Sequence, residues 1–288
     1  MKPQFLKVHT GSSYSFSVRQ DKAPNINNRW HYHEELELIH FHKGCGMQFV
    51  GDHIKHFCAG DIVLVGSNLS HYWRYDDACV TGQEDEDVYS TVIHFTEKFW
   101  GQSFLDLPEL LSIKLLLDKA KRGISLREDS SPAVALAIRA VYESGGVQRI
   151  VQLLEALSAI SAATDYQLLA SMGFKNDFST SESDRLNSIY KYTVTNFKKQ
   201  IYLGTISSEA QLVPNSFCRY FKSRTGKTYS RFLNEIRIGY ACKLLIENRS
   251  CNKEICYESG FSNYSCFYKN FKEITGKTPE VYKKDLLR

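Results

Sequence analysis

The chain has 288 residues and a formal net charge of +4, with 43% hydrophobic and 24% charged residues. This length is sufficient for two domains, each with its own core. No run reaches the roughly 18 uninterrupted apolar residues of a membrane-spanning helix, so we expect no membrane association. The first residues lack the apolar segment of a secretory signal, and the eight cysteines contain no C-x-x-C pair. We therefore expect a cytoplasmic protein with reduced thiols.

Charge and histidine are distributed unevenly along the chain. Residues 180–288 hold 19 Lys+Arg and 10 Asp+Glu, a net charge of +9, whereas the preceding residues have a net charge of −5. All nine histidines lie between His9 and His94. A basic C-terminal segment joined to an acidic N-terminal one indicates that the C-terminal part binds a polyanion.

The first half of the chain is predicted to form β-strands followed by helices. Up to about residue 98, short β-branched or aromatic runs such as 62–65 and 89–95 alternate with Gly, Asn and Asp residues. This pattern predicts an antiparallel sandwich or barrel. From about Leu107 the apolar residues follow helical spacing. The polar residues 172–183 predict a linker, so we expect domains at 1–171 and 184–288.

The C-terminal part contains an internal repeat with an offset of 50 residues. Seven of the twelve positions 217–228 recur identically at 267–278, including two Phe residues four apart. Each copy predicts a short helix, a tight turn and a second helix that ends at Gly226 or Gly276. The Phe pair points to the core, and the opposite polar, basic face suits a helix in a DNA major groove. A long helix over about 229–247 joins the copies.

The segments 219–226, 236–245, 254–261 and 271–279 resemble the AraC/XylS-type transcription regulators, over about residues 184–288. The resemblance implies an α+β protein of two domains. For the N-terminal domain, the strand pattern and a cupin-like motif described below predict a cupin-like antiparallel β-barrel with following helices that pack or dimerise. Its C-terminal domain would be all-α, with two helix-turn-helix units joined by a long helix and reading adjacent major-groove segments.

The resemblance also implies which residues contact DNA. The base-facing residues would be Asn215, Ser216 and Arg219 in the first recognition helix and Tyr264, Ser265 and Lys269 in the second. Arginine suits guanine and asparagine suits adenine, whereas Lys222 and Lys272 are better placed for phosphates or for closing the helix. The alternative for each single residue is a solvated helix face.

The first unit departs from the family pattern at three positions. Val213 stands where a capping Ser is usual, Ser207 where a small Ala packs, and Gln211 where Gly or Asn forms the turn. A missing N-cap costs about 1 kcal/mol. We therefore expect the first unit to be less rigid than the second.

A histidine cluster is predicted in the N-terminal domain. His31, His33 and Glu37 share one face of a strand, and His71 offers a fourth ligand. These residues resemble the cupin pattern H-x-H-(x)3-E-(x)6-G with a second G-D-…-H element. Such a donor set suits Zn, Mn, Fe or Ni. Alternatively, the histidines line an organic-ligand pocket or belong to the core; the candidate ligand-binding residues are Trp30, His31, His33, Glu37, His71 and Trp73.

The favoured hypothesis is a non-enzymatic, ligand-responsive transcription regulator that needs no cofactor. Its expected partners are double-stranded DNA, a small-molecule effector, RNA polymerase and a second copy of the chain. One alternative is a cupin metalloenzyme with a DNA-binding appendage, in which the histidine cluster holds a catalytic divalent transition metal. Another alternative is an architectural DNA-binding protein without a ligand.

Overall fold

The computed structural model describes residues 4–8, 14–22, 30–76, 88–171, 174, 180–247 and 251–286. The chain divides into two compact units, which are described separately below. The N-terminal unit comprises Pro3–His53 and Phe57–Met172, and the C-terminal unit comprises Gly173–Arg288, with which Ile54–His56 are grouped. Across the described ranges, every helix is too short or too polar to cross a bilayer.

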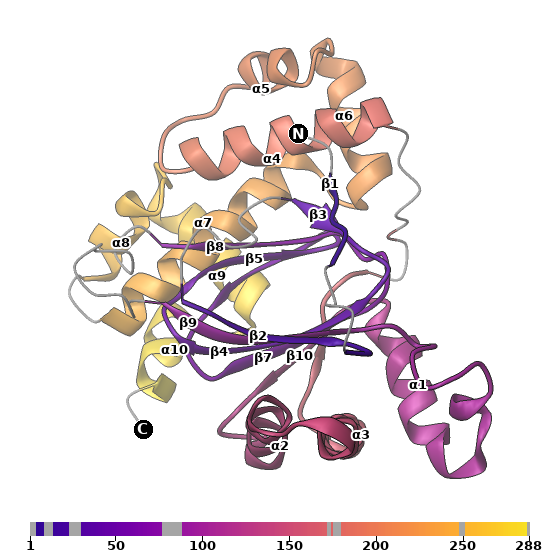
Figure 1. Ribbon diagram of the computed structural model, residues 1–288. Coiled ribbons are helices and arrows are strands. Elements are labelled where there is room, and N and C mark those ends of the chain that lie inside the picture. The colour runs from indigo at the N-terminus through magenta and orange to yellow at the C-terminus, as the bar shows by residue number, and fades with distance from the viewer. Residues whose placement is uncertain are drawn as a thin grey trace. The chain divides into compact units, whose positions relative to one another are not determined.

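Strands dominate the N-terminal unit (Figure 1). The strands are β1 (Gln4–Phe5), β2 (Ser17–Asp21), β3 (His31–Tyr32), β4 (Leu36–Lys43), β5 (Gly46–Val50), β6 (His53–Phe57), β7 (Asp61–Val65), β8 (His71–Tyr75), β9 (Tyr89–Phe95), β10 (Ile124–Arg127) and β11 (Gln167–Leu168). They form a five-stranded sheet of order β1-β3-β8-β5-β6 and a six-stranded sheet of order β11-β10-β7-β4-β9-β2.

The predicted α+β class with antiparallel sheets is confirmed, but the barrel form of that prediction is wrong, and one strand pair departs from the antiparallel pattern. Within the described residues, no strand pairing joins the two sheets, so hydrogen bonds do not close them into a barrel. In addition, β1 pairs with β3 in parallel, whereas the remaining described pairs are antiparallel. Closure depends on pairing between edge strands, which alternation in the sequence does not specify.

The two faces of β4 have different partners because side chains alternate along a strand. Leu36 and Leu38 belong to a core that includes residues of β7, β9 and β10 and three helices. These helices are α1 (Leu111–Ala120), α2 (Pro132–Glu143) and α3 (Gly146–Ala162), and short 3-10 turns at Phe104–Asp106 and Pro108–Leu110 precede α1. Figure 1 shows α2 and α3 side by side along the six-stranded sheet.

The opposite face of β4 looks toward the five-stranded sheet. Phe41 stacks on Phe57 of β6 with ring centroids 4.2 Å apart, and Trp73 and Tyr75 of β8 pack edge-on against this pair. All four side chains are buried. Aromatic rings therefore fill the space between the sheets beside Glu37, which lies on this face of β4.

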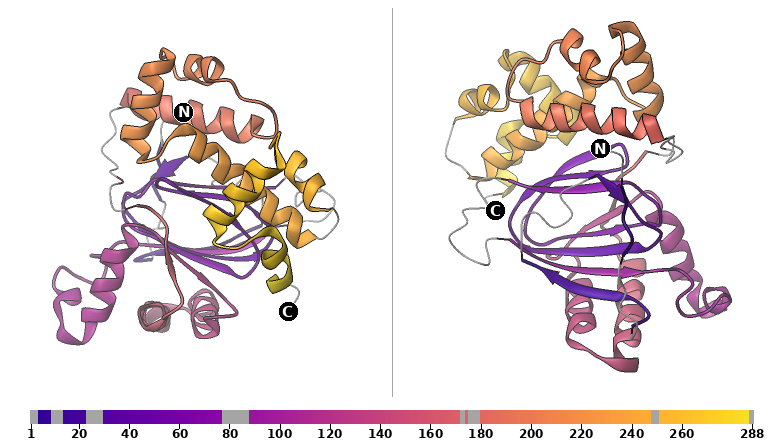
Figure 2. Two further views of the ribbon diagram at one scale, coloured as in Figure 1. Left: turned by 180° about the vertical axis from the view of Figure 1, so that it is seen from behind. Right: turned by 45° about the horizontal axis from the view of Figure 1, so that its top comes forward.

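The C-terminal unit is helical (Figure 2). Its helices are α4 (Thr180–Asn196), α5 (Leu203–Glu209), α6 (Pro214–Thr225), α7 (Tyr229–Glu247), α8 (Asn252–Glu258), α9 (Tyr264–Thr275) and α10 (Pro279–Leu286). The predicted linker over 172–183 falls mostly outside the described residues, and its last four residues belong to α4. The predicted long helix is α7, and α6, α8, α9 and α10 all pack against it.

Each half of this unit has its own aromatic core, as the repeat predicts. Phe217 and Phe221 of α6 pack against Tyr190 of α4 and against Tyr229 and Phe232 of α7. In the second half, the repeat-related residues Phe267 and Phe271 of α9 lie in a core with Ile238, Ile255 and Phe261. Two related helix-turn-helix units therefore share α7.

Candidate functional site

The two turns of the helix-turn-helix units differ in length and in chemistry. Four residues, 210–213, connect α5 to α6, whereas five residues, 259–263, connect α8 to α9. The first turn contains Gln211 with a φ of 53°, and the second contains Gly260 with a φ of 89°. A positive φ is unfavourable for a residue with a side chain, so the first turn is strained where the second is not.

The two recognition helices also differ in their N-caps, and the first again has the less favourable residue. Asn263 caps α9, and its side chain accepts a 3.0 Å hydrogen bond from the backbone N–H of Cys266. Val213 precedes α6 and makes no side-chain cap. Ser207 is buried in the first unit, but its hydroxyl donates to the carbonyl of Gly204 at 2.9 Å. The expected weakness of the first unit thus has its structural basis in Gln211 and Val213 and not in Ser207.

Most of the predicted DNA-contacting side chains are exposed on α6 and α9. Those of Asn215, Arg219, Lys222, Ser265, Lys269 and Lys272 are exposed, and those of Ser216 and Tyr264 are half-buried. Tyr264 packs on Phe267 with ring centroids 5.9 Å apart and adjoins the second core. This packing fixes the Tyr264 ring more firmly than a solvated face would.

Sequence reasoning missed Cys218, which shares the exposed face of α6 with Asn215, Arg219 and Lys222. Positions 215, 218, 219 and 222 are neighbours on a helix because they are three or four residues apart. Cys218 is exposed and borders a pocket of about 700 Å³ together with Arg219 and Lys222. Helical spacing alone identifies this position.

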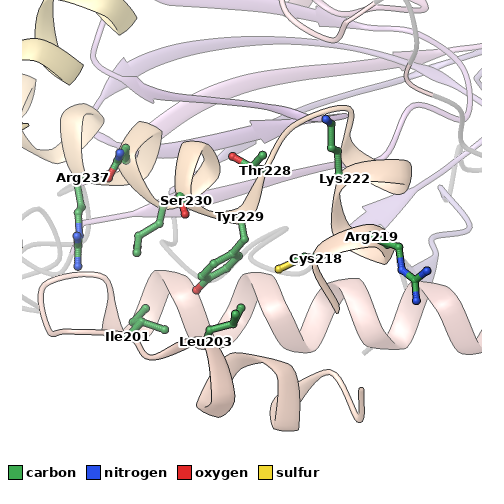
Figure 3. A pocket seen from close by; sticks show the side chains of 11 residues that line it. Ile201, Leu203, Cys218, Arg219, Lys222, Thr228, Tyr229, Ser230 and Arg237 are labelled. Atoms are coloured by element: carbon green, nitrogen blue, oxygen red, sulfur yellow. The ribbon is translucent and has the colours of Figure 1, made fainter. Parts of the chain in front are cut away.

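The pocket lies between α6 and the first turns of α7 (Figure 3). Arg219, Lys222 and Arg237 supply three cationic groups to its lining, and Ser230 and Asn234 supply polar ones. Apolar side chains, including Ile201, Leu203 and Leu233, form much of the remaining lining. The pocket adjoins the exposed face of the first recognition helix.

Polar bonds from α7 hold the second recognition helix and the end of α4. Asn234 donates to the side chain of Asn270 on α9 at 2.9 Å. The guanidinium of Arg231 is paired with the carboxylate of Glu273, also on α9. Arg237 donates to the backbone carbonyl of Phe197 at 2.9 Å and lies over the ring of Phe261 in the second turn. Helix α7 therefore packs against both recognition helices, and its polar bonds link it to α9 and to the end of α4.

In the N-terminal unit, the structure brings the four predicted cluster residues together. His31 lies on β3, His33 just after it, Glu37 on β4 and His71 on β8. Each offers one ligand atom, and these atoms all lie within 4.8 Å of one another. All four residues are at most 2% exposed. Trp30, by contrast, is a half-buried residue directly before β3.

Backbone carbonyls set the orientation of two of these imidazoles. Nδ1 of His33 lies 2.9 Å from the carbonyl oxygen of Glu35, and Nδ1 of His71 lies 2.8 Å from that of Leu69. A carbonyl only accepts, so each Nδ1 carries the proton and each Nε2 presents a lone pair. Both Nε2 atoms are buried and have no hydrogen-bond partner among the described residues.

Glu37 is a buried carboxylate that these lone pairs face. Its Oε2 lies 3.4 Å from Nε2 of His33 and 3.5 Å from Nε2 of His71. The indole N–H of Trp73 and Nε2 of His94 both lie within hydrogen-bond distance of this carboxylate, which favours its ionised form. The site therefore combines an ionised carboxylate with imidazole lone pairs, an arrangement that a cation stabilises.

Two residues that contact this cluster, His94 and Arg19, were not identified from the sequence. His94 of β9 lies opposite Glu37 in the sheet register, and its Nε2 is 2.8 Å from Oε2 of Glu37. Arg19 of β2 lies 3.1 Å from Nδ1 of the same histidine. Burial lowers the pKa of His94 to about 4, so the ring is neutral at pH 7. Trp73, predicted as a pocket wall, instead donates its indole N–H to Oε1 of Glu37 at 2.9 Å.

The comparisons with known proteins agree with the helix-turn-helix geometry. Residues 206–285 match a family model described as "Helix-turn-helix domain". The chain is 28% identical over 263 residues to the uncharacterized HTH-type transcriptional regulator YdeC of Bacillus subtilis (strain 168), covering 88% of this chain and 85% of that protein. It is 21% identical over 281 residues to the HTH-type transcriptional activator RhaS of Pectobacterium carotovorum, covering 91% and 89%. The solved structure of ToxT from Vibrio cholerae O395 covers 94% of this chain and 98% of its own at 16% identity, with a TM-score of 0.37.

These features define a DNA-binding protein of the double helix-turn-helix class. More narrowly, the chain is a DNA-binding transcription regulator, and over most of its length it is similar to HTH-type transcription regulators. The two curated relatives named above are transcription regulators and not enzymes, so the alternative of a cupin metalloenzyme finds no support in them.

Proposed function

We propose that the N-terminal unit is a cupin-like sensor domain whose effector binds at His31, His33, Glu37 and His71 and changes how the C-terminal unit binds DNA. The observation that carries this proposal is the convergence of four buried ligand atoms within 4.8 Å. A core that served only stability would gain from replacing such groups with apolar residues. A regulator that joins this site to a DNA-reading unit has the parts of a ligand-dependent switch.

The effector we propose is a divalent transition-metal ion. Ligand atoms about 2.1 Å from a tetrahedral ion lie about 3.4 Å from one another. The 3.4 and 3.5 Å distances from Glu37 Oε2 to His33 Nε2 and His71 Nε2 fit this spacing. Imidazole nitrogen and carboxylate oxygen suit Zn²⁺, Fe²⁺, Mn²⁺ or Ni²⁺. The aromatic rings of Phe41, Phe57 and Trp73 beside the cluster favour an ion over an organic molecule.

For the DNA-binding unit, we propose that α6 and α9 lie in successive major-groove segments. Arg219 and Asn215 would read bases from α6, with Ser216 beside them, and Ser265 and Lys269 would do so from α9. Tyr264 would contribute an aromatic contact. Lys222 and Lys272 would contact phosphates, and the cationic pocket beside Lys222 supports a phosphate there.

We further propose that the regulator acts as a homodimer through α2 and α3. Leu136 of α2 is 63% exposed, and Val147 of α3 is 78% exposed, which supports an apolar contact between copies. A monomeric mass by light scattering at micromolar concentration contradicts the dimer. RNA polymerase remains an expected partner, to be sought by transcription assays with the purified protein.

The effector proposal is tested on the full chain, purified gently and then freed of metal with a chelator. We expect about one equivalent of bound transition metal before chelation, and a change in affinity for the regulator's own promoter region when the metal returns. Glu37→Gln abolishes metal binding, whereas the matched control Glu34→Gln, at an exposed neighbour, retains it. Less than a tenth of an equivalent of metal, or promoter affinity indifferent to metal, contradicts this effector.

A further inference from the structure

The carboxylate of Glu37 is held by one N–H donor on each oxygen. The indole Nε1 of Trp73 donates to Oε1 at 2.9 Å, and Nε2 of His94 lies 2.8 Å from Oε2. Both donors are at most 2% exposed, so water does not compete for these bonds. The two bonds fix the plane of the carboxylate and leave further lone pairs of Oε2 toward His33 and His71.

Arg19 determines which nitrogen of His94 carries the proton. Its Nη1 lies 3.1 Å from Nδ1 of His94. A guanidinium has only donors, so Nδ1 must accept and the proton of the neutral ring must sit on Nε2. Asp21 holds the guanidinium in place, with Oδ1 2.9 Å from Nε of Arg19. Arg19 thus donates a hydrogen bond to His94, and His94 in turn donates one to Glu37.

His94 is therefore the opposite tautomer of His33 and His71. Those two rings donate from Nδ1 to backbone carbonyls and present bare Nε2 atoms. His94 accepts at Nδ1 and donates from Nε2. Four imidazoles and one carboxylate lie close together at this site. The difference in tautomer separates His33 and His71, which can act as ligands, from His94, which supports Glu37.

We propose that His94 is a positioning residue for the effector site and not one of its ligands, and that Arg19 assigns it this role. The proposal rests on the cation site proposed above and deepens it. By donating to Oε2, His94 orients Glu37 toward His33 and His71 and limits the basicity of the carboxylate. Without Arg19, the ring is free to present a lone pair at Nε2, which either repels Glu37 or turns His94 into a competing ligand.

The tautomers are tested directly in the metal-free protein by long-range ¹H–¹⁵N correlation spectra of the histidine rings. We expect protonated Nε2 for His94 and protonated Nδ1 for His33 and His71. Arg19→Met removes the donor and is expected to lose the Nε2-protonated signal of His94, whereas Arg19→Lys retains a donor and keeps it. A protonated Nδ1 on His94 in the wild-type protein overturns the assignment, whether or not the protein binds metal.

The positioning role is tested by Co²⁺ titration of the full chain, with the visible absorption of the bound ion as the readout. We expect His94→Leu to weaken Co²⁺ binding 10- to 100-fold, the range typical of outer-shell partners, with the spectrum of the bound ion unchanged. His94→Gln keeps an N–H donor and restores affinity to within a few-fold of wild type. An altered spectrum in His94→Leu identifies a lost ligand and overturns the proposal, as does wild-type affinity in that variant.

The nitrogen spectra and the Co²⁺ titration together distinguish failure of this inference from failure of the proposed metal effector. A wild-type chain that binds no Co²⁺, Zn²⁺, Mn²⁺ or Ni²⁺ contradicts the metal effector and, with it, the positioning role. The nitrogen spectra then still decide whether Arg19 sets the tautomer of His94. Near-ultraviolet circular dichroism of each variant shows whether the N-terminal unit has retained its packing around Trp73.

Discussion

Gln211 and Gly260 occupy equivalent positions in the two helix-turn-helix turns, and both have a positive φ, 53° and 89°. The backbone N–H of each bonds to a carbonyl three residues earlier, that of Ser208 at 2.9 Å and that of Tyr257 at 3.0 Å. The same turn is therefore built once with a strained residue and once with glycine. We therefore expect the first unit to have a lower local stability than the second.

Gln211→Gly is expected to stabilise the C-terminal unit by about 0.5–1 kcal/mol, because relief of the left-handed strain exceeds the entropy that glycine gains when unfolded. Denaturant unfolding of the full chain, followed in its helical signal, measures this change. Gly260→Ala is the opposite control, since an added Cβ would lie 2.4 Å from the carbonyl oxygen of Phe197. Equal effects of the same sign in both variants contradict the explanation.

The first recognition helix lacks a side-chain N-cap, which a substitution at Val213 can supply. In the second unit, Asn263 accepts the N–H of Cys266, three residues later. Val213→Asn places the same side chain before α6, where the N–H of Ser216 is the corresponding donor, and should stabilise the unit by about 1 kcal/mol. Asn263→Ala should remove a similar amount. Val213→Ala, which adds no acceptor, serves as the control; a gain in that variant equal to Val213→Asn would falsify the capping account.

Lys269 and Lys272 lie on the same helix, but we expect their substitution to change DNA binding in different ways. Lys269→Ala should cost about 1–3 kcal/mol at the specific site and reduce the preference for it over unrelated DNA. Lys272→Ala should weaken binding to all sequences similarly and lower the slope of log K against log salt by about 1. Mobility-shift titrations at several salt concentrations distinguish the two, with the exposed Lys253→Ala as control. Identical behaviour of the two variants contradicts the division into base and phosphate contacts.

We expect His42 to make the N-terminal unit sensitive to mild acid. Burial and the neighbouring His40 lower the pKa of His42 to about 4, whereas an unfolded histidine titrates near its ordinary value of 6.5. The unfolded chain thus binds the proton first, so stability is complete above pH 6.5 and declines as the pH falls toward 4. Unfolding free energies measured between pH 7 and pH 4 should fall less steeply in His42→Gln, which can still bond to Thr91 but does not titrate. An unchanged slope in that variant argues against His42 as a source of acid sensitivity.

The sequence predicts the C-terminal unit well because its information is local and repeated. Phe217 and Phe221 recur as Phe267 and Phe271, and glycines end both recognition helices. Each of these signals spans a few residues and has a direct conformational meaning. The unusual turn at Gln211 is also visible in the sequence, because the family pattern has Gly or Asn at this position.

The histidine site is only partly predictable because it depends on which strands are neighbours. His31, His33 and Glu37 are close in sequence, but the prediction that they share one strand is wrong, because His31 lies on β3 of the five-stranded sheet and Glu37 on β4 of the six-stranded sheet. His94 is 57 residues from Glu37 and reaches it only because β9 pairs with β4. Alternation assigns a residue to a face of the sheet but does not say which strand lies beside it, and Arg19 on β2 is hidden for the same reason.

The unequal turns give the protein an orientation on DNA. Both helix-turn-helix units run in the same order along the chain, yet one connection has four residues and the other five, and only the second recognition helix has a side-chain cap. A single chain therefore presents two different recognition helices in a fixed order. If both recognition helices read DNA as proposed, the site of one chain has two halves that are not interchangeable, and inverting that site reverses the orientation of the bound chain relative to the start of transcription.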